Sequence, residues 1–206
     1  MHDKNHWEQV YANKETTRVS WFQEHAEQSL RLIDASGVDP AAAIIDVGGG
    51  ASTLVDDLLG RGYWALTVLD ISAAALQAAR TRLGSAAARV SWLQGDITDM
   101  QLPVHAYALW HDRAVFHFLT SAAQRHAYVR NVLRAVQPGG HIIISTFAED
   151  GPLQCSGLPV MRYSADALHA EFGAAFELLG HAKELHHTPS GSTQMFVYCY
   201  CRIHSS

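Results

Sequence analysis

Lysine, cysteine and long apolar runs are all scarce in this chain of 206 residues. Its 3 lysines and 12 arginines give a net charge of -5, so there is no basic stripe for a phosphate backbone and we expect no nucleic-acid partner. No apolar segment reaches the length of a membrane span, so we expect no membrane partner. Three cysteines are an odd number, and Cys199 and Cys201 are spaced poorly for a disulfide, which predicts reduced thiols.

The first residues, MHDKNHWEQVY, are polar and lack the apolar core of a signal peptide, so we expect a cytoplasmic protein. The length fits one domain with a sizeable core. We therefore expect a single domain over 1–206, with N-terminal helices in 1–36 and an α/β core in 43–206. The sequence leaves the oligomeric state open.

Short apolar runs alternate with helical patterns along the core. The sequence predicts strands over 43–47, 64–69, 89–94, 106–110 and 141–147, and helices over 53–59, 73–83, 121–136 and 164–172. Two further strands flank a Pro-Ser-Gly turn near the end of the sequence. This order predicts a doubly wound, mostly parallel sheet of seven strands with a C-terminal antiparallel hairpin.

The segment IIDVGGGAS, residues 44–52, is followed by a second apolar run that ends in Asp70. Glycines after a buried strand let the backbone approach a ligand, and the next helix points its N-terminus at that ligand. An acid at the end of the next strand can accept hydrogen bonds from ribose hydroxyls. A dinucleotide fingerprint would need a small residue at position 53, where the chain has Thr53, so the pyrophosphate loop fits poorly.

The pattern Asp46-x-Gly48-x-Gly50-x-Ser52 instead resembles the first motif of class I S-adenosylmethionine (SAM) methyltransferases, D/E-x-G-x-G-x-G. The terminal hairpin is also typical of that family. The resemblance implies a Rossmann-like fold, SAM as cofactor and S-adenosylhomocysteine (SAH) as product. It also implies cofactor contacts at Asp46, Gly48, Gly49, Gly50, Ser52, Asp70, Ile71, Asp96 and Ile97.

Each acid in this set has an alternative interpretation. Asp70 follows Gly50 by 20 residues, the spacing of a ribose-binding acid, but it could also cap the helix that begins near residue 73. The resemblance gives Asp96 the adenine amino group, whereas the local sequence also suits an Asx turn. Asp46 would either hold the glycine loop or receive the methionine amino group.

The fourth strand runs into LWHDRAVFHFL, residues 109–119, which also resembles the W-D-R-G-A segment of thiopurine-type S-methyltransferases. The carboxyl ends of parallel strands face the ligand crevice, so His111, Asp112 and Arg113 are candidate catalytic residues. His111 would act as general base, Asp112 would orient it or replace it, and Arg113 would hold an anionic substrate group. Alternatively, Asp112 and Arg113 form a local ion pair or a helix cap.

Four further residues are candidate substrate contacts. Tyr11 and Trp21 precede the sheet and would belong to a lid over cofactor and substrate, or to ordinary core. His117 and Cys155, together with His111, could form a soft-ligand pocket for a metal, a metalloid or a thiol, or could be buried packing residues. No His/Cys spacing matches a zinc signature, so we expect no metal.

The predicted activity is methyl transfer from SAM to a small-molecule acceptor. A protein methyltransferase acting on lysine is the alternative within the class. A SAM-binding or nucleoside-binding regulator without turnover is the alternative outside it.

Overall fold

The computed structural model describes residues 4–205 and contains one seven-stranded sheet in the order β3-β2-β1-β4-β5-β9-β8. The five parallel strands are β1 (Ile44–Val47), β2 (Leu66–Asp70), β3 (Val90–Gln94), β4 (Tyr107–Arg113) and β5 (Val136–Phe147). Strands β8 (Phe176–His187) and β9 (Thr193–Ile203) form the antiparallel hairpin, and β9 pairs with β5. This confirms the predicted fold class.

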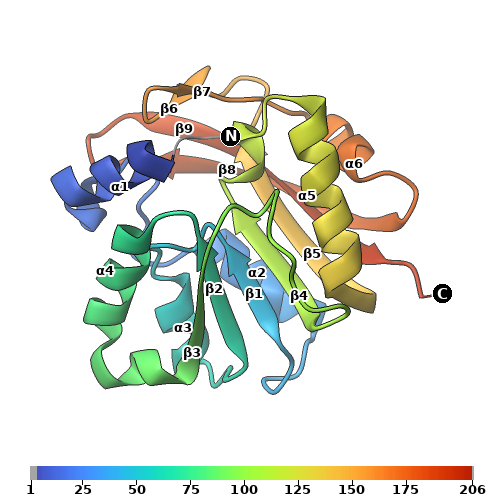
Figure 1. The fold of residues 1–206 in the computed structure, drawn as a ribbon. Coiled ribbons are helices and arrows are strands. Elements are labelled where there is room, and N and C mark those ends of the chain that lie inside the picture. The colour runs from blue at the N-terminus through green and yellow to red at the C-terminus, as the bar shows by residue number, and fades with distance from the viewer. Residues whose placement is uncertain (1–3, 206) are drawn as a thin grey trace.

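Helices cover both faces of the sheet (Figure 1). On one face, α2 (Glu27–Ser36), α3 (Leu54–Gly60) and α4 (Ala73–Leu83) pack against side chains such as Ile44 and Leu109. On the other face, α5 (Ala122–Ala135) and α6 (Ala165–Phe172) pack against side chains such as Trp110 and Ile142. The strand side chains alternate between the two cores because the period of a β-strand is two residues.

Local capping explains where two of the helices begin. The Ser72 hydroxyl accepts a hydrogen bond from the amide of Ala75 and starts α4. Ser121 and Gln124 form a capping box at the start of α5. Helix α4 matches its predicted range, and the remaining helices of the core begin and end within one residue of theirs.

Two predicted boundaries were wrong, and the first of them affects the site. The fourth strand does not end at residue 110 but continues through Arg113. The fifth strand begins at Val136, directly after α5, and so includes the Pro138-Gly139-Gly140 segment that we expected between helix and strand. A small hairpin of β6 (Gln154–Cys155) and β7 (Leu158–Pro159) also lies in the loop after β5.

The N-terminal segment is only partly helical. It contains α1 (Lys4–Asn13), a short 3-10 turn η1 (Thr16–Arg18) and α2, with an irregular stretch over residues 19–26. Figure 1 shows α1, in dark blue, beside one end of α4. No helix within residues 4–205 is both long and apolar enough to cross a membrane. Residues 1–3 of the predicted helical segment lie outside the described residues.

Candidate active site

The glycine loop lies between the carboxyl ends of β1 and β2, where it packs tightly against Asp46 and Asp70. A Cβ atom at Gly50 would clash with Asp70 Oδ2, and one at Gly49 would clash with Asp46 Oδ2. Only glycine therefore allows the loop to lie against these carboxylates. Gly50 also has a φ of 29°, in the region that favours glycine.

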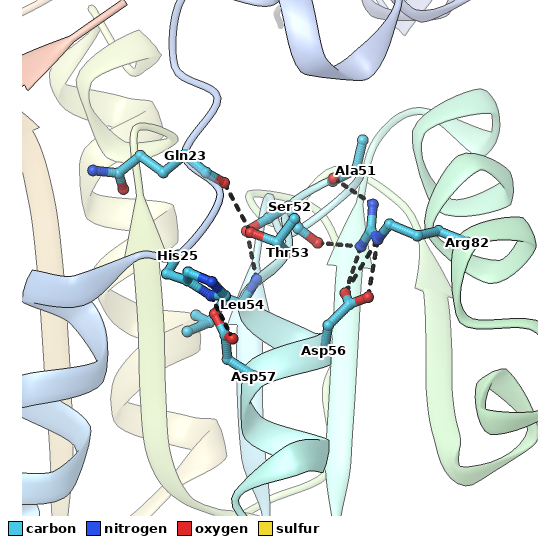
Figure 2. Close-up of polar contacts among 9 residues, drawn as sticks. All are labelled: Gln23, His25, Ala51, Ser52, Thr53, Leu54, Asp56, Asp57 and Arg82. Atoms are coloured by element: carbon cyan, nitrogen blue, oxygen red, sulfur yellow. Dashed lines mark hydrogen bonds and ion pairs between the residues drawn. The ribbon is translucent and has the colours of Figure 1, made fainter.

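The outer side of the loop is fixed by a separate polar network (Figure 2). Arg82, at the end of α4, donates to the carbonyl oxygens of Ala51 (2.9 Å) and Ser52 (2.6 Å) and pairs with Asp56. The Ser52 hydroxyl accepts from the amide of Leu54 at 3.2 Å, so it helps to start α3. These contacts hold the loop in place without using its inner surface.

A cavity opens on the inner surface of the loop. Its empty space, the open mouth included, is about 840 Å³. Its lining includes five predicted cofactor residues, namely Gly48, Asp70, Ile71, Asp96 and Ile97. It also includes Trp7, Tyr11, Trp21, Arg113, Val115, Phe118 and Cys155. The structure thus brings part of each predicted set of residues to one cavity.

The structure separates the two interpretations of Asp70, whereas Asp96 fits both of its interpretations. Asp70 is 7% exposed and accepts a hydrogen bond from the Ser72 amide at 2.8 Å, but the N-cap of α4 is Ser72. Burial, with added repulsion from Asp46 and Glu8, raises the pKa of Asp70 to about 7. Asp96 lines the cavity and also forms the Asx turn, because its Oδ1 accepts from the amide of Thr98 at 2.9 Å.

A second cavity lies on the other side of Gly48, under residues 19–26. Its lining includes Asp46, Gly48, Gly49, His111 and Arg113, and Tyr11 and Trp21 line both cavities. Ser52 also lines this second cavity rather than the first. Together the two cavities follow the glycine loop on both sides, which suits an elongated ligand.

His111 and Asp112 point to opposite faces of the sheet, because β4 continues through both residues. The His111 ring is buried and bonded at both nitrogens, with Nδ1 2.7 Å from Asp46 Oδ1 and Nε2 2.9 Å from Ser29 Oγ. This geometry leaves His111 no free nitrogen for the base function that we expected of it.

Asp112 is fully buried and lines neither of the two cavities. It accepts hydrogen bonds from the amides of Val115 and Phe116 and, at 2.6 Å, from the hydroxyl of Tyr128. Burial raises the pKa of Asp112 to about 7, although the hydrogen bonds from these donors act to lower it. The structure therefore gives Asp112 the capping role that was its alternative interpretation.

Arg113 faces the cavities and also holds the N-terminal segment in place. Its Nη1 donates to the carbonyl oxygen of Trp21 at 3.0 Å, its Nε donates to Tyr198, and its Nη2 lies 3.7 Å from Glu184. The guanidinium carbon lies 4.4 Å from the ring centre of Phe196. The predicted local ion pair with Asp112 does not form.

The predicted substrate residues divide between cavity and core. Cys155 lines the first cavity, and burial raises the pKa of its thiol to about 12, so the thiol stays protonated at neutral pH. His117 is fully buried against Phe118 and Phe147, and its Nδ1 accepts from the amide of Phe147 at 3.3 Å. Within residues 4–205 no cluster of His, Cys, Asp or Glu side chains could hold a metal ion.

Aromatic side chains from α1 and residues 19–26 close the first cavity. Trp7 packs edge-on against Trp21 (5.8 Å between ring centres) and Phe118 (5.1 Å), and Tyr11 packs against Trp21 (6.2 Å). Burial and the nearby Asp70 raise the pKa of Tyr11 far above its usual range, so its hydroxyl stays neutral. These contacts place Tyr11 and Trp21 where the predicted lid would lie.

Sequence reasoning missed Glu8, which fastens α1 to the core. Its carboxylate accepts hydrogen bonds from the amides of Ala73 (2.8 Å) and Ala74 (3.0 Å) and from the Ser72 hydroxyl (3.0 Å). Partial burial opposes ionisation, but these donors outweigh it and lower the pKa of Glu8. An acid at the N-terminus of α4 is also favoured by the helix dipole. The partners are more than 60 residues apart, so no local pattern reveals the contact.

Comparison with known proteins agrees with the geometry. Residues 44–140 match a family described as a methyltransferase domain, and they contain the glycine loop and strands β1 to β4. Over this segment the chain is similar to methyltransferase domains, and its fold is that of the class I, Rossmann-like SAM-dependent methyltransferases.

One curated protein, the mouse eEF1A lysine and N-terminal methyltransferase, is 22% identical over 151 residues. The alignment covers 70% of this methyltransferase but only 21% of the mouse protein, so this chain spans about a fifth of that relative's length.

Solved structures show the same fold over nearly the whole chain. A protein from a study of disulfide-to-thioacetal conversion in echinomycin biosynthesis has a TM-score of 0.79 and 19% identity, covering 98% of this chain and 92% of its own. The 1,6-didemethyltoxoflavin-N1-methyltransferase of Burkholderia thailandensis, solved with its substrate and SAH, has a TM-score of 0.72 and 16% identity, covering 98% and 87%. At these identities the likeness concerns the fold.

Proposed function

We propose that this methyltransferase transfers the methyl group of SAM to a small-molecule acceptor. The observation that carries the proposal is one cavity that is lined both by Asp70 and Asp96 and by Arg113, Cys155 and the aromatic cluster. The two acids suit a nucleoside, and the remaining lining suits a second, smaller compound.

The residues present fit the cofactor. Asp70 would accept from both ribose hydroxyls, Asp96 would accept from the adenine amino group, and Ile71 and Ile97 would lie against the adenine ring. When bound, SAM supplies an electrophilic methyl group on a sulfonium that is already a good leaving group. The aromatic side chains Trp7, Tyr11 and Trp21 would then exclude water and align the acceptor with that methyl group.

The cavity lacks an obvious general base. None of the described residues that line it is histidine or lysine, and Tyr11 and Cys155 keep their protons at neutral pH. We therefore propose an acceptor whose nucleophilic atom needs no deprotonation by the protein, such as a neutral nitrogen or a thiolate. Arg113 would favour a neutral or anionic acceptor over a cationic one.

The enclosure favours a small acceptor over a protein one, because α1 and its aromatic side chains cover the cavity. Because the mouse relative is a lysine methyltransferase, the test below also includes a protein acceptor. Oligomeric state and location in the cell have no bearing on this argument.

Two measurements test the proposal. Calorimetry should detect SAH binding and no comparable NAD binding; NAD binding without SAH binding would contradict the cofactor assignment. Turnover of SAM should then be assayed with heteroaromatic amines, aromatic thiols and a lysine-rich peptide as matched panels. Turnover with the peptide alone would favour a protein methyltransferase, and SAH binding with no turnover in any panel would favour a regulator.

A further inference from the structure

A buried hydrogen-bond chain runs from the end of β1 through β4 to α2. Asp46 and His111 are register partners on the adjacent strands β1 and β4. His111 Nδ1 lies 2.7 Å from Asp46 Oδ1, and its Nε2 lies 2.9 Å from the hydroxyl of Ser29. Their exposed fractions are 5% for Asp46, 2% for His111 and 0% for Ser29. Asp46 and His111 both line the second cavity, whereas Ser29 lines neither cavity.

The donors and acceptors along this hydrogen-bond chain follow from which atoms of each group carry a hydrogen. An ionised carboxylate can only accept, so Nδ1 of His111 carries the hydrogen and donates to Asp46. In the neutral ring Nε2 is then the acceptor, and the Ser29 hydroxyl donates to it. The order Ser-His-Asp resembles a hydrolase triad, but Ser29 is fully buried and no substrate can reach it. His111 also lines the second cavity, but both its ring nitrogens are occupied, so its polar effect on the site passes through Asp46.

Asp46 presents its other oxygen to the second cavity. Oδ2 receives no hydrogen bond from any described residue, and Asp46 lines that cavity together with Gly48, Gly49 and Arg113. Arg113 also lines this cavity, but its Nη2 is buried and lies 3.7 Å from Glu184. The cavity thus offers an acceptor oxygen, which complements the ammonium group of an α-amino acid, with a positive charge close by.

We propose that His111 is a positioning residue for the cofactor. It holds Oδ1 of Asp46, which turns Oδ2 towards the second cavity to receive the α-ammonium group of the cofactor's methionine part. Ser29 holds the other side of the ring and so fixes its tautomer. This inference rests on the proposed function, because it assumes that the ligand of the two cavities is SAM.

The test compares two ligands by calorimetry: SAH, and the analogue of SAH that lacks the α-amino group. His111→Leu removes the donor to Asp46, whereas His111→Asn keeps an amide N–H near the position of Nδ1. His111→Leu should weaken SAH binding roughly tenfold and leave binding of the analogue unchanged. His111→Asn should retain most of the affinity for SAH. Thermal unfolding of each variant shows whether it is folded.

Two results would overturn the inference while leaving the proposed function intact. The first is an equal loss of affinity for SAH and for the analogue in folded His111→Leu, which would indicate a structural role only. The second is a wild-type protein that binds both ligands equally well. If wild-type protein fails to bind SAH at all, the proposed function itself is wrong.

A second variant keeps the test usable if His111→Leu does not fold. Ser29→Ala leaves the His111 bond to Asp46 in place and removes only its outer support. It should weaken SAH binding by a few-fold, again without changing the affinity for the analogue. A folded Ser29→Ala protein that binds both ligands like wild type would contradict the role assigned to the hydrogen-bond chain of Ser29, His111 and Asp46.

Discussion

The affinity for SAH should increase with pH up to about 8, because Asp70, whose pKa is about 7, must ionise to bind the ribose. Burial is the largest cause that raises the pKa of Asp70 to about 7, and repulsion by Asp46 and Glu8 adds to it, while the amide of Ser72 opposes it. Ribose hydroxyls donate to the carboxylate, so the bound complex favours the ionised form and lowers this pKa. Binding therefore releases a proton at pH values below about 7.

The magnitude follows from the ionised fraction of Asp70. With a free-state pKa of about 7, that fraction falls from about one half at pH 7 to about one tenth at pH 6 and one hundredth at pH 5. The association constant for SAH should fall roughly fivefold between pH 7 and 6 and roughly tenfold between pH 6 and 5. Above pH 8 it should be constant.

Calorimetry from pH 5 to pH 8, in buffers of different ionisation enthalpy, measures both the affinity and the number of protons released. Asp70→Asn should bind SAH more weakly and without this slope. Glu8→Gln removes one repelling charge and should move the inflection to lower pH. A wild-type affinity that does not change over this range, or a slope that survives in Asp70→Asn, would refute the reasoning.

Three substitutions test other parts of the site. Asp112→Ala leaves three buried donors without an acceptor and should lower the free energy of unfolding in urea by about 3 kcal/mol; loss of SAH affinity at unchanged stability would instead support a direct role. Gly50→Ala should displace the carboxylate of Asp70 and weaken SAH binding at least tenfold in calorimetry, whereas Gly60→Ala, which meets no neighbouring atom, should not. Glu8→Gln should speed SAH release several-fold in stopped-flow measurements, because the charged contact that fastens α1 to the start of α4, worth about 1 kcal/mol, is lost.

The sequence predicted the cofactor half of the site well, because that half is made of local patterns. The glycine loop, the apolar runs and the acid at position 70 each follow from residues within a few positions of one another. The sheet then places the carboxyl ends of parallel strands at one edge, so Asp70 and Asp96 come to the same cavity. How these residues contact a ligand stays a prediction.

The substrate half depended on one strand boundary that the sequence did not reveal. Had the fourth strand ended at residue 110, His111 and Asp112 would both belong to a loop at the crevice. Because β4 continues through Arg113, alternation sends His111 towards α2 and Asp112 towards α5. A period of two residues decides which face a side chain meets, and a local pattern rarely locates the end of a strand to within two residues.

The sequence by itself determined the succession of helices and strands along the chain, the glycine loop and the identity of the acids near it, since these depend on hydrophobic periodicity and on short spacings. The tertiary structure alone decided what each polar side chain touches. Glu8 meets the start of α4, Ser29 meets His111, and Arg113 meets Trp21 across separations of 64 to 92 residues. Such contacts depend on how whole helices and strands pack, because the energy of a buried polar group is set by the partner that packing brings to it.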